Sequence, residues 1–192
     1  GYISELRERK YEYFCIGGMI TAWNFIKFST EAVKLLKPNA KVIVGGGIVS
    51  STPKSFLSLG TADVGIIGEG EDAVVETIEA FENQRPLSDV PGIVYRDETG
   101  KIIETLKRMN LPELDSLPYP AWDLLPMHKY TPLPNQYLNK PVVHMVSIRG
   151  CPFRCSFCSA DSVFGRRIRS LSPDRLVDVI KYAKNKFQAR EI

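Results

Sequence analysis

The sequence predicts an α/β protein in which helices cover a parallel β-sheet. Two observations support this prediction. Through the first hundred residues, short apolar runs alternate with longer amphipathic segments, and the apolar runs lead into glycines; this alternation is typical of strand–turn–helix units. A further apolar run at 142–148 leads through a cysteine-rich loop into a last amphipathic segment, so the same kind of unit recurs near the end of the sequence.

Three such units are predicted in the first part of the chain. The expected strands are residues 13–18, 41–44 and 64–67. A helix is expected over residues 22–36, and Lys37-Pro38 ends it because proline cannot continue a helix. Thr52 is the expected N-cap of a second, short helix, with Pro53 at its first position. A third helix is expected to have one apolar face, formed by Val74, Val75, Ile78 and Phe81.

The end of this first domain and the segment after it differ in composition. Strands 93–95 and 101–103 are expected to form a hairpin at the edge of a domain that spans residues 1–105. Residues 106–141 are expected to be a proline-rich connector. Seven of the thirteen prolines lie in residues 112–141 among several aromatic side chains, so we predict a stiff segment that packs on its neighbours.

Residues 142–192 are expected to begin a second domain. Strand 142–148 leads into the cysteine-rich loop, and Ser172-Pro173-Asp174 then begins a helix that continues to Phe187. One strand, one loop and one helix are only the first unit of a larger domain. The sequence also begins without Met, so we expect this chain to be a fragment.

Composition and charge argue against several classes of protein. No apolar run approaches the roughly 20 residues of a membrane helix, and the first residues lack the pattern of a signal peptide, so we expect a soluble, cytoplasmic protein. Residues 149–192 carry 10 Lys and Arg against 4 Asp and Glu, whereas residues 1–148 carry 15 against 18. No recognisable nucleic-acid-binding motif accompanies the basic residues, which favours an ordinary surface or an anionic cofactor or substrate over nucleic acid.

Three of the four cysteines lie within eight residues, in the pattern C-x₃-C-x₂-C directly after a predicted strand. Three clustered thiols cannot all pair as disulfides, and structural zinc sites usually need four protein ligands, so an iron–sulfur cluster with one open iron is favoured. Unconnected buried cysteines, or a zinc site completed by a partner, are the alternatives. Cys15 lies in an apolar strand and is expected to be a core residue. The three clustered cysteines are Cys151, Cys155 and Cys158.

Glycine-rich turns follow the strands of the first domain, at residues 17–21, 45–47 and 68–71. Ligands of open parallel sheets bind beyond the carboxyl ends of the strands, where glycine allows close approach of the backbone, although glycine is also ordinary turn chemistry. Neither G-x-G-x-x-G nor G-x-x-x-x-G-K-[ST] occurs, which argues against nicotinamide cofactors and nucleoside triphosphates. Glu69 and Glu71 can accept hydrogen bonds from a cofactor or interact with the dipole of the next helix.

The cysteine pattern resembles that of the radical S-adenosylmethionine enzymes, in which an aromatic residue, here Phe157, precedes the third cysteine. The resemblance implies a [4Fe–4S] cluster on Cys151, Cys155 and Cys158, whose fourth iron is chelated by S-adenosylmethionine. It also implies that an electron splits the sulfonium into methionine and a 5′-deoxyadenosyl radical, which takes hydrogen from the substrate. The backbone near Phe157 would face the adenine.

The first domain is similar to the cobalamin-binding domain of the B12-dependent class of these enzymes, although Trp23 departs from the usual Leu. The resemblance implies a partial Rossmann-like (flavodoxin-like) domain, followed by the start of a radical S-adenosylmethionine (β/α) partial TIM barrel. A Ser or Thr after one strand and a Gly-Gly after the next border the nucleotide tail of cobalamin in that class. The cofactor contacts expected here are Thr21, Gly45, Gly46, Gly47, Gly68, Glu69 and Gly70.

The function implied by these resemblances is that of a cobalamin-dependent radical enzyme, with a methyltransferase acting on an unactivated carbon as the leading expectation. The alternatives are a radical cyclase or rearrangement enzyme with a degenerate cobalamin domain, and a non-catalytic iron–sulfur, metal-binding or cobalamin-sensing module. The expected partners are a small-molecule substrate and a low-potential electron donor of the flavodoxin or ferredoxin type. No catalytic side chain is assigned, and the fragment alone is expected to be inactive.

Overall fold

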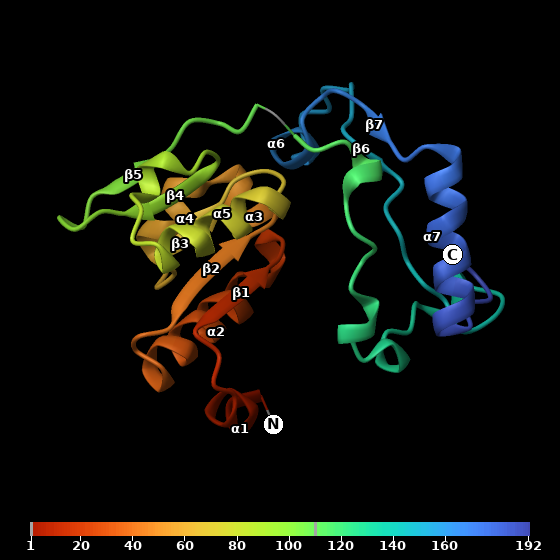
Figure 1. Ribbon diagram of the computed structural model, residues 1–192, viewed down its shortest axis with the longest axis horizontal. Helices are drawn as coiled ribbons and strands as arrows, with labels where there is room; N and C mark the ends of the chain where they lie inside the picture. The colour runs from red at the N-terminus through yellow and green to blue at the C-terminus, as the bar shows by residue number, and fades with distance from the viewer. Residues whose placement is uncertain (1, 110) are drawn as a thin grey trace. The chain divides into compact units, whose positions relative to one another are not determined.

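The computed structural model describes residues 2–109 and 111–192, which form two compact units (Figure 1). Unit 1 comprises the described residues of Gly1–Leu111 together with Phe153–Arg166, and unit 2 comprises Pro112–Pro152 and Arg167–Ile192. No helix in the described ranges has the length and apolar character needed to cross a membrane. Helices and a partly parallel sheet occur together in unit 1, which confirms the predicted α/β class.

Unit 1 contains a five-stranded sheet in the order β1-β2-β3-β4-β5. The first three strands are parallel, and the last two form the predicted antiparallel hairpin. Because β1, β2 and β3 run in the same direction, the glycine turns that follow them lie at one edge of the sheet. The strands are β1 (Tyr13–Gly17), β2 (Lys41–Gly45), β3 (Val64–Ile66), β4 (Ile93–Arg96) and β5 (Ile102–Glu104).

The three helices predicted for the first domain are present in the expected order, and unit 1 contains three further helices that were not predicted. The glycine turn after β2 continues directly into a five-residue helix, α3, before the predicted helix at Pro53 begins. The helices are α1 (Tyr2–Glu8), α2 (Trp23–Leu36), α3 (Gly47–Ser51), α4 (Pro53–Leu59), α5 (Glu71–Glu82) and α6 (Ala160–Phe164). Two 3₁₀ turns, η1 (Ile20–Ala22) and η2 (Leu87–Asp89), complete the unit.

Alternating side chains of β2 divide the core of unit 1 into two clusters. Val42 and Val44 pack with residues of α2, α3 and α4 on one face of the sheet, whereas Ile43 packs with residues of β3, β4 and α5 on the other. All three β2 side chains are almost completely buried. A strand covered on both faces is apolar at every position, and burial of each such side chain contributes about 1.5–3 kcal/mol.

Two local predictions for unit 1 are wrong, and a third is confirmed only in part. Thr52 occupies the N-cap position of α4 and Pro53 begins the helix, as predicted, but the Thr52 hydroxyl group makes no capping hydrogen bond and donates instead to the carbonyl oxygen of Ile48, 3.1 Å away. Val75 is 55% exposed and so lies outside the apolar face of α5. Cys15 is exposed rather than a core residue. It pairs with Ile43, on the face that α5 covers, but β1 lies at the edge of the sheet and leaves the cysteine accessible.

Unit 2 contains a long helix, α7 (Pro173–Phe187), whose predicted N-cap is confirmed: the Ser172 hydroxyl accepts a 3.2 Å hydrogen bond from the backbone N–H of Arg175. The predicted strand 142–148 is wrong in extent. Val142 makes only an isolated parallel bridge to Glu191, and a strand of two residues forms further on. A strand needs backbone partners along its length, and the described part of unit 2 supplies them only at these two places. The remaining elements are η3 (Leu114–Ser116), η4 (Trp122–Leu124), η5 (Met127–Lys129), η6 (Pro134–Gln136), β6 (Ile148–Arg149) and β7 (Arg169–Ser170).

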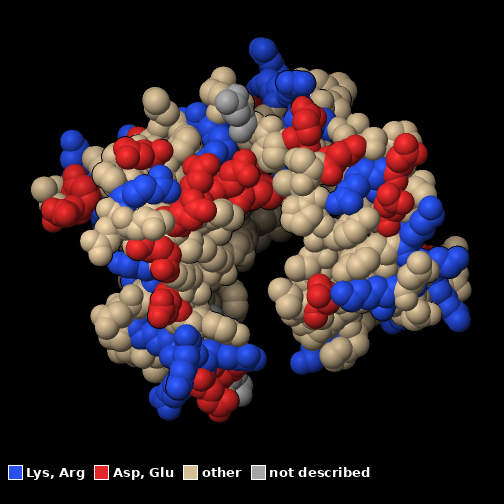
Figure 2. Space-filling model, in the orientation of Figure 1, with Lys and Arg blue, Asp and Glu red and all other residues tan. Residues whose placement is uncertain are grey.

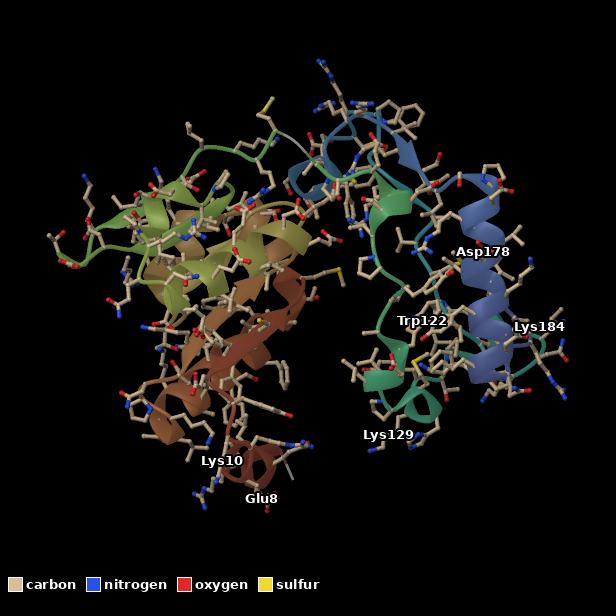
Figure 3. The ribbon with its side chains drawn as sticks, in the orientation of Figure 1. Glu8, Lys10, Trp122, Lys129, Asp178 and Lys184 are labelled. Carbon is tan, nitrogen blue, oxygen red and sulfur yellow. The ribbon has the colours of Figure 1, made fainter. Side chains whose placement is uncertain are left out.

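The proline-rich segment of unit 2 packs along α7. Trp122 points toward this helix (Figure 3) and joins a buried cluster with Val143, Val179 and Ala183. The rings of Tyr119 and Tyr182 stack with their centroids 4.8 Å apart. Polar contacts add to these apolar ones, for the Arg175 side chain donates a 2.6 Å hydrogen bond to the carbonyl oxygen of Leu117, and Asp115 accepts one from the Ser172 backbone.

Candidate cofactor sites

Backbone contacts join the first two glycine turns at the carboxyl edge of the sheet. The N–H of Gly18 donates to the carbonyl oxygen of Gly45, and the N–H of Ile48 donates to that of Gly18, both at 3.3 Å. Gly46 has a φ of +90°, and a β-carbon there would lie 2.7 Å from the carbonyl oxygen of Gly18. Only glycine fits at this position, because its backbone is left-handed and another turn lies against it.

Ser50 joins the second turn to the third. Its side chain donates a 3.0 Å hydrogen bond to the carbonyl oxygen of Gly46 and accepts a 2.9 Å bond from the backbone N–H of Gly68. Ser50 is buried, so this hydroxyl group satisfies two polar groups that little water can reach. Sequence reasoning missed Ser50; the available signal is a lone hydroxyl in the apolar run directly after the triple glycine.

The predicted cobalamin contacts lie along this edge. Gly45, Gly46 and Gly47 belong to the second turn, Gly68, Glu69 and Gly70 to the third, and Thr21 to the exposed η1 after the first.

Open space and charge further characterise the edge. A β-carbon at Gly17 or Gly47 would meet no atom within 4 Å, so the backbone of both turns borders open space. Glu69 is buried. The first turn of α5 carries Glu71 and Asp72, and acidic side chains gather over this part of unit 1 (Figure 2). Carboxylates at a helix N-terminus interact favourably with the helix dipole.

The cysteine loop has free thiols and a turn around its last two cysteines. Cys155 and Cys158 are exposed, and Cys151 is half-buried. The backbone N–H of Cys158 donates to the carbonyl oxygen of Cys155 at 3.1 Å, and the Cys158 sulfur accepts from the N–H of Ala160 at 3.5 Å. Hydrogen bonds to sulfur are a feature of thiolates that hold iron–sulfur clusters.

The three cysteines of the loop are divided between the two units. The boundary between the units falls after Pro152, so Cys151 belongs to unit 2, and Cys155 and Cys158 belong to unit 1. In residues 2–109 and 111–192, no three His, Cys, Asp or Glu side chains are arranged to hold a metal ion. Three free, accessible thiols nevertheless match the donor set of a cluster that leaves one iron open. Phe157 is 90% exposed and available to a ligand.

Helix α6 follows the third cysteine and packs on the glycine edge of unit 1, a contact that sequence reasoning missed. The hydroxyl oxygens of Ser51 and Ser162 lie 3.1 Å apart. A β-carbon on Gly68, whose φ is +82°, would lie 3.4 Å from the carbonyl oxygen of Val163. Arg166 pairs with the Asp161 carboxylate at 2.8 Å and so ties the end of α6 to its first turn.

Comparison with known proteins identifies the last quarter of the chain most directly, because residues 145–192 match the Radical SAM superfamily. An uncharacterized methyltransferase of Pyrococcus horikoshii is 32% identical over 163 residues, which cover 84% of this chain and 34% of that protein. The anaerobic magnesium-protoporphyrin IX monomethyl ester cyclase of Rubrivivax gelatinosus is 31% identical over 79% of this chain and 27% of its own length. The chain thus spans about a third of the length of these relatives.

Two solved structures have a similar fold across almost the whole chain. One is the cobalamin-dependent S-adenosylmethionine radical enzyme OxsB, with aqua-cobalamin and S-adenosylmethionine bound. The match covers 99% of this chain and 27% of the OxsB chain, with a TM-score of 0.73 and 20% sequence identity. The other is the radical S-adenosylmethionine methyltransferase TsrM from Kitasatospora setae, with tryptophan substrate and an S-adenosylmethionine analogue bound. The match covers 99% of this chain and 38% of the TsrM chain, with a TM-score of 0.68 and 16% sequence identity. At these identities the likeness concerns the fold.

Proposed function

Since this chain belongs to the radical S-adenosylmethionine superfamily, we propose that it is part of an enzyme that uses a [4Fe–4S] cluster, S-adenosylmethionine and cobalamin to methylate an unactivated carbon of a small molecule. One observation above all supports this function. The segment that carries two of the clustered cysteines packs, through α6, on the glycine edge of unit 1. A single compact unit therefore combines features suited to both cofactors.

Cys151, Cys155 and Cys158 would hold the cluster. When bound, the cluster would supply the electron that splits S-adenosylmethionine. The residues of this chain contribute ligation and positioning. The Cys158 sulfur already accepts a backbone hydrogen bond from Ala160, and the exposed Phe157 beside it offers a surface for the adenine.

The glycine edge would hold cobalamin. Glycines with open space beside them let the backbone approach a bulky cofactor, and Ser50 keeps two of the turns at a constant separation. The proposed contacts are those expected from the sequence: Thr21, Gly45, Gly46, Gly47, Gly68, Glu69 and Gly70.

For the domain organisation we propose a cobalamin-binding-like domain at residues 1–105, a connector at 106–141 and the start of a barrel at 142–192. The superfamily match at residues 145–192 supports the last of these. A low-potential electron donor of the flavodoxin or ferredoxin type would reduce the cluster, in a cytoplasmic setting. A radical cyclase is the second candidate, because a magnesium-protoporphyrin cyclase is among the relatives at 31% identity.

The test uses the full-length protein that contains this chain, purified and reconstituted without oxygen. We expect the electron paramagnetic resonance signal of the reduced cluster to change when S-adenosylmethionine is added, because the open iron gains ligands. Cys155→Ala is expected to abolish the cluster, whereas the matched control Cys15→Ala retains it. A cluster signal that ignores S-adenosylmethionine would favour a non-catalytic iron–sulfur module.

Cobalamin is tested separately, by the corrinoid absorbance that the protein retains after gel filtration. Retained absorbance supports the cobalamin half of the proposal. A colourless, cluster-loaded protein that still responds to S-adenosylmethionine would instead identify a radical enzyme with a degenerate cobalamin domain. Product analysis with methyl-labelled S-adenosylmethionine then separates methyl transfer from cyclisation.

A further inference from the structure

Helix α6 joins the cysteine segment to the turns at the carboxyl edge of the sheet in unit 1. We propose that Ser51 and Ser162 are positioning residues that couple the two candidate cofactor sites, so that loading the cysteine loop stabilises the glycine turns and corrinoid binding at those turns stabilises the loaded loop. The proposal rests on the proposed function for the identity of the cofactors. It follows from three successive contacts.

The first contact lies within the glycine edge. The buried Ser50 hydroxyl group bridges Gly46 and Gly68, so a shift of either turn disturbs the hydrogen bond to the other. Ser50 and Ser51 are consecutive residues of the short helix α3. A ligand that fixes the turns therefore also fixes the position of the Ser51 backbone.

The second contact runs from α3 to α6. The Ser162 hydroxyl group donates its proton to the carbonyl oxygen of Ser159, 2.7 Å away, so Ser51 must be the donor in the 3.1 Å contact between the two serines. The carbonyl oxygen of Val163 faces Gly68, where a β-carbon would lie at an ordinary van der Waals distance of 3.4 Å. Helix α6 thus makes one polar contact with the glycine edge and has its backbone beside the third turn.

The third contact runs from α6 to the cysteines. The first residue of α6, Ala160, directs its N–H at the Cys158 sulfur, and Cys158 closes a turn with Cys155. Arg166, just beyond the end of α6, pairs with Asp161 and donates to the carbonyl oxygen of Phe153, 3.4 Å away. This bond closes the segment into a loop, so a rearrangement at the cysteines changes the position of α6.

The size of the coupling is bounded by the contact that transmits it. A hydrogen bond of ordinary net strength changes an equilibrium constant by about two- to tenfold. Thermodynamic linkage requires the effect to be reciprocal: the factor by which the loaded cluster tightens corrinoid binding equals the factor by which corrinoid tightens the cluster site.

The test compares three forms of the full-length protein, purified without oxygen: wild type, Ser162→Ala and Ser51→Ala. Ser58→Ala is the matched control. The Ser58 hydroxyl group donates to the carbonyl oxygen of Ser55 three residues earlier, as the Ser162 hydroxyl group does to that of Ser159, but Ser58 makes no side-chain hydrogen bond to another element among the described residues. The first measurement is amide hydrogen exchange of the peptides that contain residues 45–51 and 68–71, with and without reconstituted cluster.

Cluster loading is expected to slow exchange in these peptides in wild type and in Ser58→Ala, by about two- to tenfold. This slowing of exchange is expected to be lost in Ser51→Ala and in Ser162→Ala. The double variant that carries both substitutions is expected to respond as either single variant does, because both remove the same contact. An equal response in all four proteins, or none in wild type, would overturn the proposal. This measurement needs no cobalamin, so it tests the coupling even where the cobalamin part of the proposed function fails.

The second measurement is the dissociation constant of aqua-cobalamin with and without the cluster. We expect the ratio of the two constants to exceed about two in wild type and to fall toward one in both coupling variants. Ser162→Thr keeps the hydroxyl group and is expected to restore the wild-type ratio. A ratio that is the same in wild type and Ser162→Ala would contradict the coupling, whereas absence of any corrinoid binding would contradict the cofactor assignment instead.

Discussion

The hydroxyl group of Ser50 accepts a 2.9 Å hydrogen bond from the backbone N–H of Gly68, which lies 18 positions further along the chain. The same hydroxyl donates to the carbonyl oxygen of Gly46. One buried side chain therefore sets the separation between two turns that belong to different strand–helix units. Neither turn has to be rigid by itself.

Replacing Ser50 by alanine is expected to destabilise unit 1 by about 1–3 kcal/mol, because the N–H of Gly68 loses its partner in a buried place. Urea denaturation followed by circular dichroism measures the change. The exposed Ser58→Ala serves as the control and is expected to stay within about 0.5 kcal/mol of wild type. Equal stability of both variants would show that Ser50 does not hold the turns together.

Two glycine substitutions separate the folding role of the edge from its proposed cofactor role. Gly46→Ala is expected to destabilise the fold by about 1–3 kcal/mol or more, because the left-handed backbone strains any β-carbon and this one would also meet Gly18. Gly47→Ala adds a β-carbon in open space and is expected to leave stability nearly unchanged. In the full-length protein it should still weaken corrinoid binding. Unchanged binding in Gly47→Ala would place cobalamin elsewhere.

Trp122→Ala is expected to destabilise unit 2 by about 3–5 kcal/mol, the usual cost of removing a large buried aromatic side chain. Trp122 is only 7% exposed and packs between the connector and α7, where its ring contacts those of Tyr182 and Phe187. Leu124, in the same 3₁₀ turn, is 81% exposed. Leu124→Ala is therefore the control, and comparable losses in both variants would show that Trp122 does not anchor the connector to α7.

The phenolic O–H of Tyr13 donates a 2.6 Å hydrogen bond to the Glu82 carboxylate. This bond raises the pKa of Tyr13 from 10.0 to about 12. The raised pKa means that the folded protein favours the neutral phenol, so the stabilisation is complete below pH 10 and is lost as the pH rises toward 12. The pKa of Tyr13 is measured as the difference between the ultraviolet absorbance titrations of wild type and of Tyr13→Phe. Glu82→Gln is expected to return its pKa toward 10, and an unchanged titration would exclude Glu82 as the cause.

Local chemistry explains which parts of the fold could be predicted. The strands before each glycine turn, the proline that ends α2 and the serine that caps α7 depend on residues close together in the chain, and the structure has them where the sequence indicates. The cysteine pattern is also local, because three cysteines within eight residues favour a cluster loop by their spacing, and the family resemblance rests on the same residues.

Contacts between distant segments explain the errors. Cys15 lies in an apolar strand, but its exposure depends on the position of β1 at the edge of the sheet. The run 142–148 has the composition of a strand, but a strand also needs partners, and Val142 finds only Glu191. Thr52 is the exception, because it has the predicted N-cap position and its hydroxyl group bonds locally, to Ile48 four positions earlier, rather than to the first turn of α4.

The sequence by itself determined the α/β class and the order of the five strands and of α2, α4 and α5 in unit 1, because each depends on short-range patterns. Through its family resemblance it also indicated the residues proposed to bind a cluster and cobalamin. Only the tertiary structure decided that Ser50 joins two turns and that Ser51 meets Ser162, 111 residues away. A hydroxyl group has the same local signature whether it bonds to its own turn or to a distant one. The partner is chosen when the sheet brings the ends of its parallel strands to one edge.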